Sequence, residues 1–187
     1  MTETPRADTH RVGALVFLLA GVMLFAGLMA AYLVLRYGGT AWPAPGTPAL
    51  PVRLAGFNTL VILTSSLALQ HGIRGMRLLD AFRLRRGLFA AAALGLLFLA
   101  LQAVQWRRLL AAGLPFAGPV QGTIFYVITG LHAAHALSGV IWLLAIAIRQ
   151  SRPWVTGRTE RGIEVCAYYW HFVGAVWAAV YVLLYLL

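Results

Sequence analysis

The sequence predicts an all-α membrane protein, a bundle of five transmembrane helices. Two observations lead to this fold class. Of the 187 residues, 61% are hydrophobic and only 11% are charged, whereas soluble domains carry roughly 25% charged residues. The apolar residues also gather into five long runs, each close to the ~20 residues that a helix needs to cross a hydrocarbon core. So little polar surface could not cover a water-soluble globule, and a soluble fold is therefore excluded.

The five apolar runs follow one another with short connections. They cover residues 13–35, 54–70, 88–106, 123–148 and 165–187. The first run exceeds the roughly 7 to 15 apolar residues of a signal peptide, and no clear cleavage segment follows it, so we interpret it as a retained span. Residues 37–48 contain three prolines, which fix φ and favour extended chain, so we expect a stiff surface crossover there. The predicted domains are a tail, 1–12, and a membrane domain, 13–187.

The distribution of arginine predicts the orientation of the bundle. All fifteen basic residues are arginines and only five residues are acidic, for a net charge of +10. Eleven arginines fall on the side of the N-terminal tail and the second and fourth connections: Arg6, Arg11, Arg74, Arg77, Arg83, Arg85, Arg86, Arg149, Arg152, Arg158 and Arg161. The opposite side has Arg36, Arg53, Arg107 and Arg108. The positive-inside rule therefore places the N-terminus in the cytoplasm and the C-terminus outside. We interpret the clusters as anchors for anionic headgroups, without a nucleic-acid role.

Cys166 is the only cysteine. A disulfide within the chain and a thiolate-rich metal site are excluded, because both need more than one thiol. Its neighbours are apolar, and we expect a small buried side chain. The sequence has no nucleophile paired with a base, no phosphate-binding loop and no adequate metal cage, so we assign any catalysis to partner subunits.

A few polar residues lie at membrane depth, where they cost free energy unless they face protein, a cavity or a bound group. They are Asn58, Thr59, Thr64, Ser65, Ser66, Gln102, Gln105, Thr129, His132, His135, Ser138 and His171. His132 and His135 are three residues apart and share a helix face. One hypothesis is that one of them pairs with His171 to ligate a haem between helices. The alternative, which we favour, is that neutral imidazoles hydrogen-bond to neighbouring helices or lipid.

A ridge of small residues lies on another flank of the fourth span. It consists of Gly130, Ala134 and Ser138. Small residues at this spacing let a neighbouring helix backbone come close. We therefore expect the fourth span to be packed on two sides, near the centre of the bundle.

Two motifs resemble a known family. Residues 167–185 read Ala-Tyr-Tyr-Trp-His-Phe-Val-Gly-Ala-Val-Trp-Ala-Ala-Val-Tyr-Val-Leu-Leu-Tyr, which resembles the last helix of cytochrome c oxidase subunit III and its signature Tyr-Trp-His-Phe-Val-Asp-x-Val-Trp. Residues 125–135, Phe-Tyr-Val-Ile-Thr-Gly-Leu-His-Ala-Ala-His, are similar to the motif Phe-Tyr-x-x-Thr-Gly-x-His-Gly-x-His of that family. Shorter matches follow in the family's order at Phe17, Phe25, Asn58-Thr59, Ser65-Ser66, Phe98, Gln102 and Trp106.

The resemblance implies an accessory, non-redox subunit III of a haem-copper terminal oxidase in aerobic respiration. Such subunits pack against the catalytic subunit I, in a complex with subunit II, hold phospholipid, and support proton uptake and stability. The chain would carry no cofactor, since haem and copper belong to the partner subunits. Its five spans resemble the short form of the family, whose two missing helices can follow subunit I. The implied location is a bacterial-type inner membrane. The alternatives are the similar small subunit associated with nitric oxide reductase and subunit III of a quinol oxidase.

The resemblance also implies a set of lipid-binding or structural positions. They are Arg149, which matches a family position that contacts a lipid headgroup, with His132, His135, Trp170, His171 and Glu164. Three positions depart from the family, because Gly21, Gln105 and Gly174 stand where its members usually have an acidic residue. We therefore expect this chain to act through packing and lipid retention, without a carboxylate that titrates inside the membrane.

Overall fold

The structure, a computed structural model, describes residues 6–38, 42–43, 45–150 and 159–187. Its helices are α1 (Arg6–Tyr37), α2 (Val52–Arg77), α3 (Ala81–Ala111), α4 (Val120–Arg149) and α5 (Thr159–Tyr181), and α5 continues into a short π-helix, η1 (Val182–Leu186). All five α-helices are long and apolar enough to cross a membrane, and the described residues include no strand. The predicted fold class is therefore confirmed, while the orientation of the termini stays a prediction.

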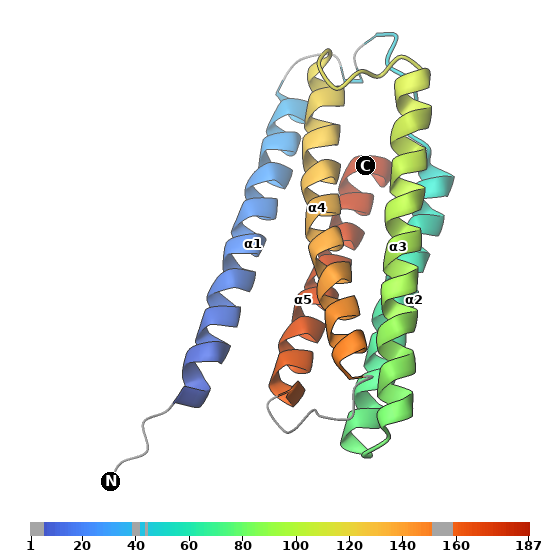
Figure 1. The fold of residues 1–187 in the computed structure, drawn as a ribbon. Helices are drawn as coiled ribbons and strands as arrows, with labels where there is room; N and C mark the ends of the chain where they lie inside the picture. The colour runs from blue at the N-terminus through green and yellow to red at the C-terminus, as the bar shows by residue number, and fades with distance from the viewer. Residues whose placement is uncertain (1–5, 39–41, 44, 151–158) are drawn as a thin grey trace.

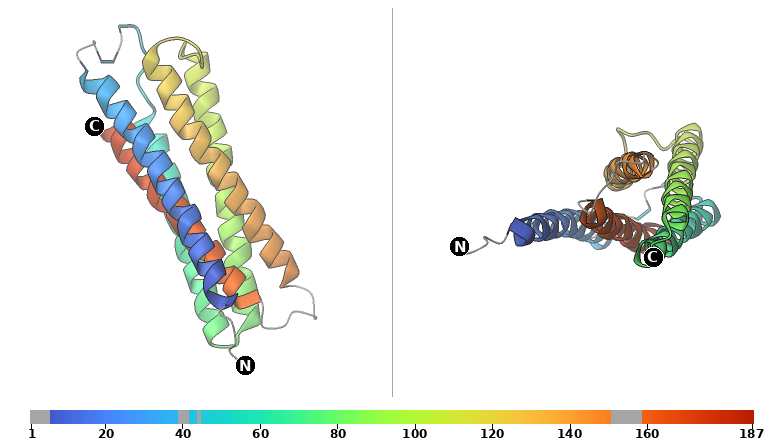
Figure 2. Two further views of the ribbon diagram at one scale, coloured as in Figure 1. Left: turned by 90° about the vertical axis from the view of Figure 1, so that its left-hand side faces the viewer. Right: turned by 60° about the horizontal axis from the view of Figure 1, so that its bottom comes forward.

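Four of the helices form the body of the bundle, and the fifth stands at its edge. The helices α2 and α3 make an extensive antiparallel hairpin, α4 packs against α3, and α5 packs against both α2 and α4 (Figure 1). The helix α1 lies beside α5 and α4 and has much less contact with them (Figure 2). The core consequently lies between α2, α3, α4 and α5.

The α2–α3 hairpin is tight because two glycines meet between its helices. A Cβ atom built at Gly87 would lie 2.4 Å from the Cα atom of Gly72, so only glycine fits at this crossing. At the turn, Leu79 has a positive φ of 58°. Asp80 caps α3, because its Oδ1 accepts a hydrogen bond of 2.9 Å from the backbone N–H of Arg83. These contacts fix the register of the two helices.

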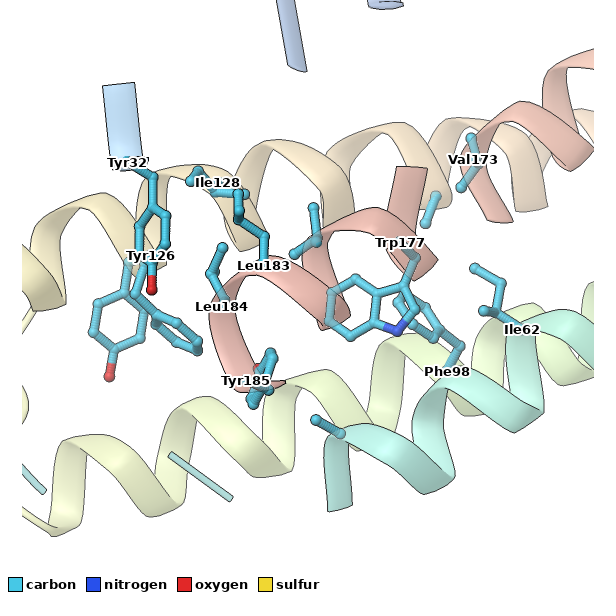
Figure 3. Close-up of a cluster of buried hydrophobic side chains, with 14 of the residues drawn as sticks. Tyr32, Ile62, Phe98, Tyr126, Ile128, Val173, Trp177, Leu183, Leu184 and Tyr185 are labelled. Atoms are coloured by element: carbon cyan, nitrogen blue, oxygen red, sulfur yellow. The ribbon is translucent and has the colours of Figure 1, made fainter. Parts of the chain in front are cut away.

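Large aromatic side chains fill the core. The indole of Trp170 lies between α3 and α4, where a Cβ atom at Gly95 or at Gly139 would each come within 2.7 Å of it. Further along α5, Trp177 points toward α2 and α3 beside Ile62 and Phe98 (Figure 3). The rings of Trp177 and Phe98 meet edge to face with centroids 4.9 Å apart. Cys166 is 1% exposed in this core, as predicted.

The ridge of small residues on α4 does not pack as predicted. Ala134 and Ser138 are exposed, and within the described chain nothing lies within 4 Å of a Cβ atom built at Gly130. The close helix contacts use Gly72 with Gly87, and Gly95 with Gly139 around an indole, instead. The ridge prediction was wrong, because small-residue spacing shows where a backbone can approach but not whether one does. The expectation that α4 packs on two sides is confirmed by its contacts with α3 and α5.

Candidate functional site

The polar side chains at membrane depth join helices to one another. One device occurs three times: a tryptophan N–H donates to a hydroxyl group, and that hydroxyl donates to a backbone carbonyl. The first copy joins α5, α2 and α3, since Trp170 donates to Ser65 over 3.0 Å and Ser65 donates to the carbonyl of Ala91 over 2.8 Å. Each hydroxyl thereby uses both its donor and its acceptor capacity, which burial in an apolar interior requires.

The other two copies of the device bind α5 to α2 and α3 to α4. Trp177 donates to Thr59 over 3.0 Å, and Thr59 donates to the carbonyl of Ala55 over 2.9 Å. Trp106 donates to Thr129 over 3.1 Å, and Thr129 donates to the carbonyl one turn back in its own helix over 2.8 Å. Three of the predicted polar residues, Ser65, Thr59 and Thr129, therefore serve as partners for the indoles of neighbouring helices, whereas Thr64 donates to a carbonyl of its own helix.

His132 is a hydrogen-bonded core residue. It is 1% exposed, and its Nε2 lies 3.0 Å from the backbone carbonyl oxygen of Val173 in α5. Because a carbonyl only accepts, Nε2 carries the proton, and Nδ1 has no hydrogen-bond partner among the described residues. The ring lies 5.0 Å from that of Trp177 and 5.6 Å from that of Phe98. With Nε2 bound to the carbonyl, this nitrogen is not available to a haem iron.

His135 and His171 lie at more open positions, on different sides of the bundle. His135 donates through Nδ1 to the carbonyl of Leu131 over 2.8 Å and faces α1, where its ring meets that of Phe25 at 5.2 Å. His171 donates through Nε2 to Oε1 of Gln70 in α2 over 3.3 Å. The structure thus places His171 against α2 and places His132 and His135 between α4, α5 and α1.

We expect alanine substitutions of the buried His132 and the half-buried His171 to differ in their effect on the stability of the bundle. His132→Ala removes a ring enclosed by aromatic neighbours and should destabilise the bundle by about 2 kcal/mol, because a buried side chain is deleted. His171→Ala removes one half-buried hydrogen bond and should cost about 1 kcal/mol or less. The measurement is the denaturant midpoint of helicity for each full-length variant in detergent. Equal losses would show that the ring packing of His132 contributes nothing.

Neutral groups occupy the three positions at which the resemblance led us to expect acids. A Cβ atom at Gly21 would lie 2.9 Å from the ring of Phe172, so this ring fills the space of a side chain at position 21. Gln105 is fully buried, and its Oε1 accepts a hydrogen bond of 2.9 Å from the hydroxyl of Tyr185. A Cβ atom at Gly174 would lie 3.2 Å from Oγ of Ser66. Each position is therefore closed by packing or by a neutral hydrogen bond.

A small cavity lies beside Gly21, between α1, α4 and α5. Its volume is about 160 Å³, and most of its lining is apolar, with His135 and Tyr169 on one wall. The hydroxyl of Tyr169 donates to the carbonyl of His135 over 2.9 Å and lies 2.7 Å from Oγ of Ser138. The polar groups of this wall are therefore bound to one another, and an apolar group such as a lipid chain suits the remaining space.

The remaining predicted residues lie away from the histidines. Arg149 is exposed at the last residue of α4, and Glu164 is half-buried early in α5, so both lie at the same end of the bundle. Trp170 belongs to the core device described above. Among the predicted arginines, Arg152 and Arg158 lie outside the described residues, and the side chains of Arg6, Arg11, Arg77 and Arg161 are not described.

Sequence reasoning missed two polar contacts at the other end of the bundle. Tyr185 reaches back to Gln105, as given above, and Arg36 donates to the hydroxyl of Tyr32 over 3.0 Å and to the backbone carbonyl of Leu187. Arg36 directly follows an apolar run. An arginine at such a position can lay its aliphatic stem along the apolar surface while its guanidinium forms hydrogen bonds at the membrane border. Nothing in the sequence indicates that one of its partners is the carbonyl of Leu187, the residue after η1.

These features define a class of protein: a multi-pass helical membrane protein whose buried polar groups join helices. A sequence profile of the family described as "Cytochrome c oxidase subunit III" matches residues 4–187. The chain belongs to this family, whose members are subunits of cytochrome c oxidase, an oxidoreductase complex. The resemblance inferred from the motifs is thereby confirmed.

Individual relatives are similar over nearly the whole chain. "Cytochrome c oxidase subunit 3" of Synechocystis sp. is 34% identical over 181 residues, which are 96% of this chain and 76% of the relative. The protein of the same name from Corynebacterium diphtheriae is 34% identical over 183 residues, 96% of this chain and 89% of the relative. "Probable cytochrome c oxidase subunit 3" of Mycobacterium tuberculosis is 34% identical over 186 residues, with coverage of 96% and 89%.

Proposed function

We propose that this chain is the accessory, non-redox subunit III of a haem-copper terminal oxidase in a bacterial-type plasma membrane. It packs against the catalytic subunit I in a complex with the copper-bearing subunit II, and it retains phospholipid. Haem and copper belong to these partners, and catalysis takes place there. The names of its relatives favour a cytochrome c oxidase over a nitric oxide reductase or a quinol oxidase.

The observation that carries this proposal is that buried polar groups form hydrogen bonds between the helices of this chain. The three tryptophan–hydroxyl devices and the bond from His132 to Val173 join helices of this chain. Hydrogen bonds of this kind hold the helices in fixed positions, as a scaffold subunit requires. The neutral residues at the three usually acidic positions support the same view, because no carboxylate replaces them in the packed interior. We infer that support of proton uptake is indirect, through the shape and lipid shell of the complex.

The helix α1 supports the predicted contact with subunit I. Only 17% of its most apolar stretch is buried within this chain, compared with 39% to 56% for the other four helices. Its outward side chains are large and apolar, such as Met23, which is 75% exposed. We therefore place the helices of the neighbouring subunit, with lipid between, against this free face of α1.

A photo-reactive benzoyl-phenylalanine at position 23 tests this contact. In the native membrane, the Met23 variant should cross-link to the haem-copper subunit I. The matched control is the same residue at Leu67 of α2, which is 70% exposed and should react with lipid only. A complex that cross-links from Leu67 but not from Met23 would mean that subunit I lies against α2, and the proposed placement would be wrong.

A further inference from the structure

A second hollow lies on the outside of the α2–α3 hairpin, away from the cavity beside α1. Its volume is about 620 Å³. His71, Asp80, Phe82, Arg83 and Arg86 line the end nearest the turn of the hairpin, which we call the mouth, and Ala68, Gly87 and Ala90 line the rest, which we call the floor. We name this hollow the hairpin groove. The floor is open because Ala68 and Ala90 carry only a methyl group each, whereas the side-chain position of Gly87 faces Gly72.

The hairpin groove crosses the border of the membrane. The apolar run of α2 ends at residue 70, and the run of α3 begins at residue 88. His71, Arg83 and Arg86 therefore lie at headgroup depth, while Ala68 and Ala90 lie in the hydrocarbon layer. A molecule that fits this groove therefore has a polar end at headgroup depth and an apolar end in the hydrocarbon layer.

The guanidinium groups of Arg83 and Arg86 at the mouth are held by neighbouring rings, but their charges are not neutralised by the described residues. In the described part of the chain, neither Arg83 nor Arg86 forms an ion pair with a carboxylate. Nη2 of Arg83 lies 3.3 Å from Nδ1 of His71, and Nε of Arg83 is buried without a hydrogen-bond partner. The guanidinium of Arg86 lies over the ring of Phe82, 5.3 Å from its centroid. The carboxylate of Asp80 also lines the groove, and its Oδ1 accepts the N-cap hydrogen bond of α3.

The contact between Arg83 and His71 also fixes the imidazole tautomer. A guanidinium can only donate, so Nδ1 of His71 is the acceptor. The proton of the neutral ring is then on Nε2, which becomes a further donor at the mouth. The mouth thus offers two guanidinium groups and an imidazole N–H, a set of donors suited to phosphate oxygens.

We propose that the hairpin groove binds an anionic phospholipid. Its phosphate accepts hydrogen bonds from Arg83, Arg86 and His71, and the start of one acyl chain lies over Ala68 and Ala90. A carboxylate from a partner protein would match the cations but leave the apolar floor unfilled, and for this reason we favour a lipid. The site needs only that the chain spans a membrane, and it lies on other helices than Arg149.

The test uses the full-length chain in nanodiscs of phosphatidylcholine with a small share of spin-labelled phosphatidylglycerol. The measured quantity is the preference of the protein for the labelled anionic lipid. Arg83→Gln with Arg86→Gln should lower this preference about tenfold, because it removes two charge-assisted donors to the phosphate. Ala90→Phe, which fills the floor and leaves every charge, should lower it severalfold. The matched control, Arg107→Gln with Arg108→Gln at the other end of α3, removes the same charge and should leave it within about twofold.

Two results would overturn the proposal. If Ala90→Phe has no effect, the arginines attract anionic lipid as an unshaped patch and the groove is not a site. If the arginine pair leaves the lipid preference unchanged but releases a protein subunit from the native complex, the groove binds a partner's carboxylate. Protection of Cys166 from a maleimide verifies that each variant is folded, and Ala90→Leu replaces Ala90→Phe if the larger ring opens the bundle.

Discussion

Replacing Trp170 with alanine is expected to destabilise the bundle by about 3 kcal/mol. The indole is fully buried between Gly95 and Gly139 and donates to Ser65, so the change leaves a cavity and a Ser65 oxygen that no longer accepts a hydrogen bond. We take the lower end of the range for deletion of a buried aromatic ring, because lipid also accommodates apolar side chains and part of the transfer term is lost. The measurement is the denaturant midpoint of helicity for the full-length chain in detergent.

Trp142→Ala is the matched control for this prediction. Trp142 lies on α4 with 36% of its surface exposed, so its loss creates no enclosed cavity. Trp170→Phe keeps most of the ring and removes only the N–H donor, and it should cost about 1 kcal/mol. If Trp170→Ala and Trp142→Ala have similar midpoints, the indole between the two glycines is not a main source of stability.

The second large effect is expected at the crossing of α2 and α3. Gly87→Ala introduces a Cβ atom 2.4 Å from the Cα atom of Gly72, and a backbone atom cannot move aside as a side chain can. The two helices must separate, which should cost about 3 kcal/mol, at the upper end of overpacking effects. The reaction rate of Cys166 with a maleimide reports opening of the bundle, and it should rise on the order of 100-fold.

Gly130→Ala provides the same substitution without the contact. In the described chain, a Cβ atom at Gly130 meets nothing within 4 Å, and alanine favours helix over glycine by about 1 kcal/mol. The reaction rate of Cys166 in this variant should therefore stay equal or fall. A Gly87→Ala chain that reacts as slowly as the unchanged protein would contradict the close approach of α2 and α3.

The positions of the spans could be predicted from the apolar runs in the sequence, but the ends of the helices could not. The run 54–70 lies within α2, Val52–Arg77, and the run 88–106 lies within α3, Ala81–Ala111. Each helix continues into the headgroup layer with arginine-bearing turns, because backbone hydrogen bonds do not stop where apolar side chains do. The apolar pattern marks the hydrocarbon layer, and the helix is longer than that layer.

The sequence was enough to predict which polar residues belong to the candidate site, but it was not enough to predict which side chains they contact. Membrane depth was enough to single out Ser65, Thr59 and Thr129 as polar groups in need of partners. Their partners are indoles of other helices, and pairing over 105 residues, as between Ser65 and Trp170, leaves no spacing to read in one sequence. The hairpin groove was missed for a related reason, since a hollow beside small side chains such as Ala68 and Ala90 forms only once two helices are side by side.

The most direct test of the proposed function is the composition of the complex that this chain belongs to. A tag on the N-terminal tail would allow purification from the native membrane in mild detergent, followed by mass spectrometry of the subunits and a visible spectrum. We expect a haem-copper subunit I and a copper-bearing subunit II, with haem absorption that disappears when the chain is separated from them. Co-purification with a nitric oxide reductase instead, or haem that stays with the isolated chain, would contradict the assignment as a non-redox subunit III of an oxidase.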